Sequence, residues 1–119
     1  MANIMIVDDS IIVRKNLNSI LSAAGHNVVA EADNGELAVQ LFDKHKPDLT
    51  TMDITMPRMN GIDAVRKIMN KYETAKIIVI SGIDQKNLIL EALELGIINY
   101  ILKPVSANNL IEKINKALE

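Results

Sequence analysis

The chain has 119 residues, the size of one domain, and its 13 basic and 15 acidic residues give a net charge of −2. Such a balance provides no bulk attraction to nucleic acid or to a membrane surface. The absence of cysteine excludes a disulfide framework, a cysteine–zinc site and a thiol nucleophile, and two histidines are too few for a histidine-rich metal site. No apolar run reaches the roughly 18 residues of a membrane span, and the N-terminus lacks the features of a signal peptide. We therefore expect a cytoplasmic protein in which residues 1–119 form one domain.

Short apolar runs recur every 22 to 27 residues along the chain. They cover residues 4–7, 28–30, 49–52, 77–80 and 100–102. Runs of this length, partly β-branched and bounded by polar or turn residues, are typical of strands that are buried on both faces of a parallel sheet.

Apolar residues between and after these runs follow helical spacing. The five stripes, in chain order, are Val13, Leu17, Ile20, Leu21 and Ala24; Leu37, Ala38, Leu41 and Phe42; Ile62, Val65, Ile68 and Met69; Leu88, Ala92 and Leu95; and Leu110, Ile111, Ile114 and Leu118. Gly25 and Gly96 are predicted to end the first and fourth helices, and Pro47 to follow the second. The predicted N-caps are Asp9 or Ser10, Asp33 or Asn34, Asp84, and Ser106. Alternation of strand and helix over the whole length predicts a doubly wound α/β fold with helices on both faces of a parallel sheet.

Polar residues follow four of the predicted strands at their carboxyl ends, where open α/β sheets bind ligands. They are Asp8-Asp9, Asp53, Ser81-Gly82 and Lys103-Pro104. Taken singly, each is better explained as a helix cap, a turn residue or a solvated charge. Their joint placement at four strand ends indicates a shared site.

Three carboxylates in one pocket would raise the pKa of at least one of them unless a cation offset their charge. Mg²⁺ (or Mn²⁺) prefers oxygen ligands, and together with Lys103 it brings the formal charge of the site to zero. Such a site can receive a phosphoryl group, for which an Asp is a covalent acceptor. Ser81 can donate a hydrogen bond to one phosphoryl oxygen and Lys103 can pair with another.

At these positions the chain resembles the receiver domains of two-component response regulators, which have the CheY-like fold. The resemblance covers residues 4–118. It is carried by Val7-Asp8-Asp9-Ser10, residues 52–57 with Asn60-Gly61, Ser81-Gly82 and residues 100–104. It implies a five-stranded parallel sheet of order 2-1-3-4-5 flanked by five helices.

The resemblance also implies a role for each matching position. Asp53 would be the phosphoacceptor, and Asp8, Asp9 and Asp53 would hold Mg²⁺ with the backbone carbonyl of Thr55. Ser81 would be the switch hydroxyl, Lys103 would bind the phosphoryl group, and Tyr100 would be the switching aromatic residue. The Lys103–Pro104 peptide would be cis.

The resemblance implies phosphoryl transfer from a sensor histidine kinase or a phosphotransfer protein. The chain would catalyse its own phosphorylation and dephosphorylation rather than act as an enzyme with a turnover substrate. The first helix, with Ile11, Lys15 and Asn18, and the loop 104–107 would dock the kinase. A surface of the fourth helix, fifth strand and fifth helix would signal to a protein target, without direct contact to nucleic acid or membrane, as a monomer or a weak phosphorylation-dependent dimer.

Several local expectations concern residues around this site. Thr55 and Ile83 offer no carboxylate or amide to orient an attacking water, so we expect slow self-dephosphorylation. Six of the eight residues 88–95 are apolar, and Ile89 and Leu93 are expected off the core face, where they would contact a partner or be partly buried. Both His26 and His45 are expected to be exposed.

Other function classes fit less well. A phosphatase of the haloacid dehalogenase type wants a second Asp two residues after its nucleophile, where this chain has Thr55. A flavin module wants a phosphate-cradling first loop and aromatic residues, and the first loop here carries Asp8-Asp9. A degenerate receiver that acts only as an interaction module is disfavoured because no acidic or lysine position is lost. We expect a stand-alone receiver, with a receiver fragment of a longer transcriptional or enzymatic regulator as the alternative.

Overall fold

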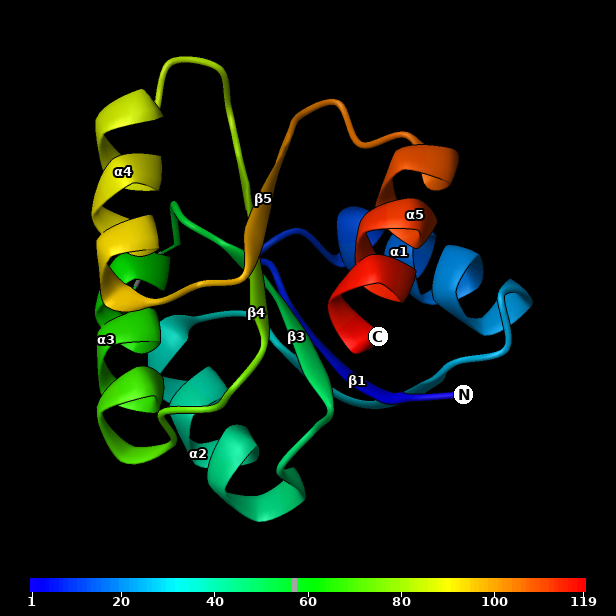
Figure 1. Cartoon of the computed structure of the whole chain (residues 1–119), viewed down its shortest axis with the longest axis horizontal. Coiled ribbons are helices and arrows are strands. Elements are labelled where there is room, and N and C mark those ends of the chain that lie inside the picture. Colours follow the sequence, from blue (N-terminus) through cyan, green and yellow to red (C-terminus); the bar gives the residue numbers. More distant parts are fainter. Residues whose placement is uncertain (57) are drawn as a thin grey trace.

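The computed structural model describes residues 1–56 and 58–119, so Pro57 of the 52–57 motif lies outside the described residues. Strands and helices alternate along the chain (Figure 1). They are β1 (Asn3–Val7), α1 (Ile11–Ala23), β2 (Asn27–Ala32), α2 (Gly35–His45), β3 (Leu49–Asp53), α3 (Gly61–Lys71), β4 (Ile77–Ser81), α4 (Lys86–Leu95), β5 (Asn99–Leu102) and α5 (Ala107–Leu118).

The strands of the described residues form one parallel sheet in the order β2-β1-β3-β4-β5. This confirms the predicted doubly wound α/β class and the order 2-1-3-4-5. Because the order reverses direction after β1, the loops that follow the neighbouring strands β1 and β3 lead to helices on opposite faces of the sheet, and a crevice for ligands is expected between them.

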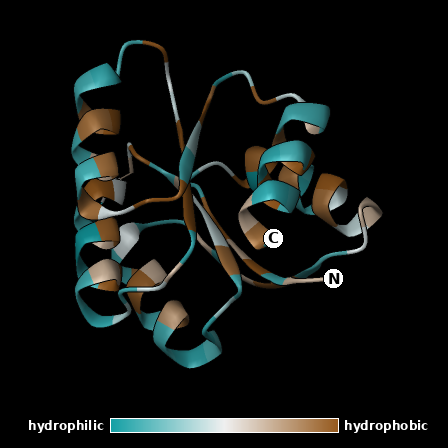
Figure 2. Ribbon diagram, viewed as in Figure 1, coloured by the Kyte–Doolittle hydropathy of each residue, from teal (hydrophilic) through white to brown (hydrophobic). Residues whose placement is uncertain are grey.

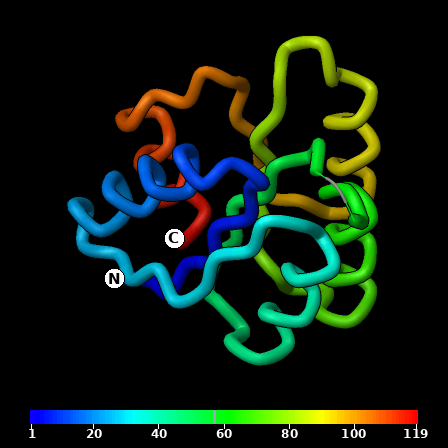
Figure 3. The backbone as a smooth tube through the Cα atoms, turned by 180° about the vertical axis from the view of Figure 1, so that it is seen from behind, coloured from blue at the N-terminus to red at the C-terminus, as the bar shows by residue number. Residues whose placement is uncertain are grey.

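Helices cover both faces of the sheet. In Figure 1, α1 and α5 lie to the right of the strands and α2, α3 and α4 lie to the left and below; Figure 3 shows the same two layers from behind. Alternate residues of β1 face opposite layers: Ile4 and Ile6 pack in the core under α1 and α5, while Met5 and Val7 pack in the core under the other three helices. Apolar residues therefore predominate in β1 and β4, whereas β3 also carries two threonines and Asp53; Figure 2 accordingly colours the strands in a mixture of brown, white and teal.

Polar side chains cap most of the helices as predicted. Ser10, Asn34 and Ser106 accept hydrogen bonds from the backbone N–H groups three residues on, at 3.3, 2.8 and 3.1 Å. The prediction for α4 was wrong: Gln85, not Asp84, is its N-cap residue, and the side chain of Gln85 makes no capping hydrogen bond to the helix. The side-chain oxygen of Gln85 instead accepts a hydrogen bond from the N–H of Gly82.

The rotation of α4 about its axis also differs from the prediction. Ile89 is only 6% exposed and packs in the core with Ala92, so its expected place off the core face was wrong, whereas Leu93 is 41% exposed. Leu88, expected in the core stripe, is 36% exposed. Because most residues of this helix are apolar, their periodicity is compatible with more than one buried face.

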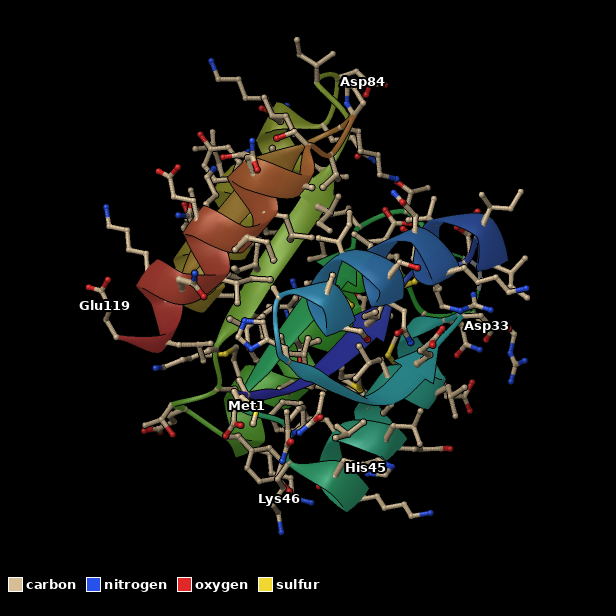
Figure 4. All side chains as sticks on the ribbon, turned by 90° about the vertical axis from the view of Figure 1, so that its right-hand side faces the viewer. Met1, Asp33, His45, Lys46, Asp84 and Glu119 are labelled. Atoms are coloured by element: carbon tan, nitrogen blue, oxygen red, sulfur yellow. The ribbon has the colours of Figure 1, made fainter. Side chains whose placement is uncertain are left out.

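His26 is buried, contrary to expectation, and its Nδ1 accepts a hydrogen bond from the N–H of Ala2 at 3.1 Å. This contact joins the residue before β2 to the start of β1. His45 is exposed, as predicted. Figure 4 shows His45 and Lys46 at one end of the molecule and Asp84, in the loop after β4, at the opposite end. None of the helices formed by residues 1–56 and 58–119 has the length and apolar character of a membrane span.

Candidate functional site

The sheet register brings the predicted site residues to one edge. Val7 of β1 pairs with Met52 of β3, and Asp53 at the end of β3 pairs with Ile80 of β4. The next residue after each of Val7 and Ile80 is a polar one, Asp8 or Ser81. Side chains from three neighbouring strands therefore meet at the carboxyl edge of the sheet, where the loops open.

Three carboxylates converge at this edge. Oxygen atoms of Asp8, Asp9 and Asp53 all lie within 4.8 Å of one another. Asp8 and Asp53 are buried, whereas Asp9 is exposed at the rim. Because like charges at this separation repel, the group requires positive charge to balance it.

Asp8 is held in place by its own loop and by α1. Its Oδ1 accepts a hydrogen bond from the N–H of Ser10 at 2.9 Å, and its backbone carbonyl accepts one from Arg14 at 2.7 Å. Arg14 in turn pairs with Glu31 at 3.3 Å. Burial raises the pKa of Asp8, an effect that the Ser10 hydrogen bond opposes. Among the residues that the structure describes, Asp8 Oδ2 is a buried oxygen without a hydrogen-bond partner.

Asp53 has the most perturbed carboxyl group of the site. It is only 3% exposed, and burial, reinforced by the negative charge of Asp8, raises its pKa to about 6. The ammonium group of Lys103 opposes this rise from 3.3 Å away from Oδ1. A carboxylate that loses solvation without full compensation is poised to bind a cation.

Ser81 and Lys103 approach Asp53 from β4 and from the loop after β5. Ser81 is fully buried, and no hydrogen-bond partner for its hydroxyl occurs in residues 1–56 and 58–119. Its backbone carbonyl accepts a hydrogen bond from the N–H of Lys103 at 2.8 Å, which fixes the two loops against each other. The Lys103–Pro104 peptide bond is cis.

The loop after β3 folds back closely over Asp53. The N–H of Gly61, at the start of α3, donates to the carbonyl of Ile54 at 2.7 Å. A Cβ atom at Gly61 would overlap the backbone carbonyl of Asp53. Only glycine leaves room for this close approach, so Gly61 sets the path of the backbone that presents Asp53.

Thr55 is exposed two residues after Asp53, and its hydroxyl accepts a hydrogen bond from the side-chain amide of Gln85. Ile83 is 82% exposed. Gln85, which was not predicted from the sequence, brings a carboxamide to the loop that follows Asp53. Nothing in the local pattern marks it, because its partner lies 30 residues away in the chain.

Tyr100 lies on β5 at some remove from the carboxylates. Its backbone carbonyl accepts a hydrogen bond from Lys113 Nζ at 2.7 Å, and the same ammonium lies 5.3 Å from the centre of its ring. The ring lines a groove of about 260 Å³ between α4 and β5. The other lining residues are Ile83, Lys86, Ile89, Leu90, Leu93 and Leu102.

The donor set suits a hard divalent cation. The three carboxylates offer only oxygen atoms as ligands. Among the described residues, the buried Oδ2 of Asp8 has no hydrogen-bond partner, so it is available to bind a cation. Mg²⁺ binds through a few carboxylates and retains several waters, which the exposed rim at Asp9 permits. The residues present therefore fit such an ion.

Comparisons with known proteins agree with this arrangement. A family model described as the response regulator receiver domain matches residues 4–115. The chemotaxis protein CheY of Thermotoga maritima is 44% identical over 113 residues, which cover 95% of this chain and 94% of that protein. CheY of Bacillus subtilis is 44% identical over 115 residues, which cover 97% of this chain and 96% of that protein.

Solved structures of this family have the same fold. The crystal structure of the CheX–CheY–BeF₃–Mg²⁺ complex from Borrelia burgdorferi matches with a TM-score of 0.94 at 33% identity, over 98% of this chain and 89% of that one. The response regulator domain of Thermotoga maritima CheB matches with a TM-score of 0.90 at 35% identity, over 98% of this chain and 95% of that one. The chain thus belongs to the response regulator receiver family of two-component systems and is a CheY-like receiver domain.

Proposed function

We propose that the chain is a phosphoacceptor whose Asp53 receives a phosphoryl group from a phosphohistidine on a sensor histidine kinase or phosphotransfer protein. The observation that supports this most strongly is the convergence of three carboxylates within 4.8 Å, with Lys103 Nζ 3.3 Å from Asp53. Residues 1–119 act as one receiver unit, which catalyses its own modification rather than the turnover of a separate substrate.

In the proposed reaction, a carboxylate oxygen of Asp53 attacks the phosphorus atom. A P–O bond forms, the P–N bond to the donor histidine breaks, and its electron pair returns to the imidazole, which takes a proton from solvent. Asp53 must be ionised to attack, and a pKa of about 6 leaves it mainly ionised at neutral pH. Later a water attacks phosphorus, the acyl P–O bond breaks, and inorganic phosphate leaves.

Asp8, Asp9 and Asp53, together with the backbone carbonyl of Thr55, are the groups proposed to hold Mg²⁺ or Mn²⁺. Such an ion would supply positive charge that offsets the carboxylates and stabilises the transferring phosphoryl oxygens. Lys103 pairs with a second oxygen, and Ser81 donates its unpaired hydroxyl to a third. The Borrelia burgdorferi CheY, solved with BeF₃ and Mg²⁺, lends support by its close similarity in fold.

The signalling step is proposed to be a two-state change. Ser81 moves toward the phosphoryl group, Tyr100 turns inward into the space that this movement vacates, and the surface of α4, β5 and α5 repacks. The groove beside Tyr100, with the exposed apolar side chains of Leu90 and Leu93, supports a protein target at this surface. The target is not nucleic acid or membrane, and the receiver is a monomer or a weak phosphorylation-dependent dimer.

The kinase is proposed to dock on α1 and the loop 104–107. Ile11 and Lys15 are exposed near the start of α1 and available for contact. Asn18 is half-buried and donates to Glu31 at 3.0 Å, so it contributes less to such a surface.

Two versions of this function differ in what the receiver controls. A stand-alone role in chemotaxis-type signalling is supported by the CheY proteins of Thermotoga maritima and Bacillus subtilis, because the match covers 94% and 96% of their lengths. A role as the receiver part of a longer regulator is the second candidate, since PdtaR of Mycobacterium tuberculosis, a transcriptional regulatory protein, matches at 38% identity over 56% of its length.

Incubation with acetyl phosphate and Mg²⁺ tests the proposal. Intact-mass measurement should show the addition of one phosphoryl group to the wild type and none to Asp53→Asn. Equal modification of both proteins, or no modification of either under conditions that modify a CheY relative, would count against it.

A further inference from the structure

The side chain of Gln85 connects the two loops that flank Asp53. Its Oε1 accepts a hydrogen bond from the N–H of Gly82, in the loop after β4, at 2.7 Å. Its Nε2 donates to the hydroxyl of Thr55, in the loop after β3. One carboxamide therefore uses both its acceptor and its donor to hold the β3 and β4 loops together.

The first of these contacts fixes the peptide group that follows Ser81. The Ser81–Gly82 peptide is held at its carbonyl by the N–H of Lys103 at 2.8 Å, and at its N–H by Gln85. Because both ends of this planar group are bonded, a shift of the Ser81 backbone would lengthen or break at least one of the two hydrogen bonds.

The loop around Gly82 is closed on itself. The N–H of Gln85 donates back to the carbonyl of Gly82 at 3.1 Å. A Cβ atom at Gly82 would lie 2.8 Å from Asp84 Oδ1 and 3.7 Å from Gln85 Oε1. The N–H of Gly82 is thus bonded to the side chain of Gln85. Gly82 follows β4, which lies next to β3 and Asp53 in the sheet. A free backbone N–H at this edge would stabilise an anion bound there.

We propose that Gln85 is a positioning residue that stabilises the unphosphorylated arrangement of the site and competes with a phosphoryl group on Asp53 for the Ser81–Gly82 segment. This inference rests on the proposed function. The carboxamide binds the resting arrangement of both loops, so it shifts the two-state equilibrium away from the phosphorylated form. Phosphorylation then releases Gln85 from Gly82 and frees the start of α4, which borders the groove at Tyr100.

Beryllofluoride, a mimic of the phosphoryl group, measures this competition at equilibrium. Its affinity in saturating Mg²⁺ is read from ¹H–¹⁵N NMR titrations of the full chain. Gln85→Ala should bind beryllofluoride about fivefold or more tightly than the wild type, since each lost hydrogen bond corresponds to roughly a fivefold change. Gln85→Met, which keeps the length of the side chain but loses both hydrogen bonds, should show the same gain.

Two further variants separate the contacts. Thr55→Val removes only the hydroxyl partner and should give a smaller gain, and the effect of Gln85→Ala should shrink in that background. Asn87→Ala removes an exposed carboxamide in the first turn of the same helix and should leave affinity unchanged. The Gly82 amide should exchange with solvent faster in Gln85→Ala, whereas Mg²⁺ affinity should stay the same.

The outcomes distinguish the inference from the function on which it rests. Equal or weaker beryllofluoride binding by Gln85→Ala and Gln85→Met, with normal binding by the wild type, overturns the competition and leaves the phosphoacceptor role intact. A wild type that binds Mg²⁺ but not beryllofluoride contradicts the proposed function, and the competition with it.

Discussion

Lys103 Nζ lies 3.3 Å from Asp53 Oδ1, although 50 residues separate the two in the chain. The lysine side chain is 41% exposed, whereas the carboxylate is 3% exposed. Lys103 therefore reaches a buried charge from the rim of the site, where its ammonium group can also meet an incoming anion. The parallel sheet brings this pair together, because in the sheet of the described residues only β4 lies between β3, which ends at Asp53, and β5, which ends just before Lys103.

The raised pKa of Asp53 predicts a pH-dependent gain in stability for Asp53→Asn. The folded protein holds this proton more tightly than the unfolded chain, with pKa values of about 6 and 3.8. The wild type is therefore destabilised by the ionised carboxyl group above about pH 6, and this cost disappears as the pH falls toward 4. Urea unfolding at pH 7.5 should show Asp53→Asn more stable by about 1–3 kcal/mol.

The same comparison at lower pH provides the control. The difference between Asp53→Asn and wild type should shrink steadily between pH 7 and pH 4. Glu94→Gln, at an exposed position on α4, should show no such change. A difference that stays constant over this range would show that burial of the charge is not its cause.

Mg²⁺ should stabilise the wild type by binding to the carboxylate group. Ligand binding to the folded state alone adds about 2.7 kcal/mol at a hundred times the dissociation constant. In thermal unfolding, increasing MgCl₂ should raise the Tm of the wild type. The Tm of Asp9→Asn, which lacks the exposed carboxylate, should rise only slightly. An equal rise for both proteins, or the same rise with NaCl of matched ionic strength, would indicate charge screening rather than a metal site.

Phosphoryl loss should be slow in the wild type. Ile83 is 82% exposed and offers no group that orients a water, and the side chain of Thr55 carries neither a carboxylate nor an amide. Ile83→Glu introduces a carboxylate that can act on an attacking water, so it should shorten the lifetime of the phosphorylated protein. Decay is measured after removal of the phosphodonor, and an unchanged rate would refute this reasoning.

The rotation of α4 predicts that lysine substitutions at two apolar residues of this helix lower stability by very different amounts. Ile89→Lys buries a charge where the side chain is 6% exposed, and it should cost more than about 3 kcal/mol of unfolding free energy. Leu93→Lys, at a position that is 41% exposed, should change stability by less than about 1 kcal/mol. Denaturant unfolding of both variants checks this, and similar costs would mean that the helix faces the core differently.

The fold was predictable because its signals are local. The strands β1 and β4 are short apolar runs that are almost wholly buried, and each of the caps at Ser10, Asn34 and Ser106 depends on a residue three positions away. The proximity of Asp8 and Lys103 to Asp53 was also expected from the sequence, because the carboxyl ends of parallel strands lie at one edge of the sheet.

The missed features depend on contacts between distant parts of the chain. His26 is buried because the N–H of Ala2 becomes its partner, 24 residues away. The side chain of Gln85 does not cap α4 but forms hydrogen bonds with Gly82 in the loop after β4 and Thr55 in the loop after β3. Ile89 turns inward because α4 carries apolar residues on several faces and the surrounding structure selects one. Local periodicity carries no information on any of these choices.

Locating the phosphoryl group tests the central claim most directly. The protein is treated with acetyl phosphate and Mg²⁺, the acyl phosphate is reduced with borohydride, and peptides are sequenced by mass spectrometry. We predict reduction of Asp53 to homoserine in the wild type, dependent on Mg²⁺, and its loss in Lys103→Met. Reduction at another carboxylate, or at none while Mg²⁺ and beryllofluoride bind elsewhere, would contradict the account.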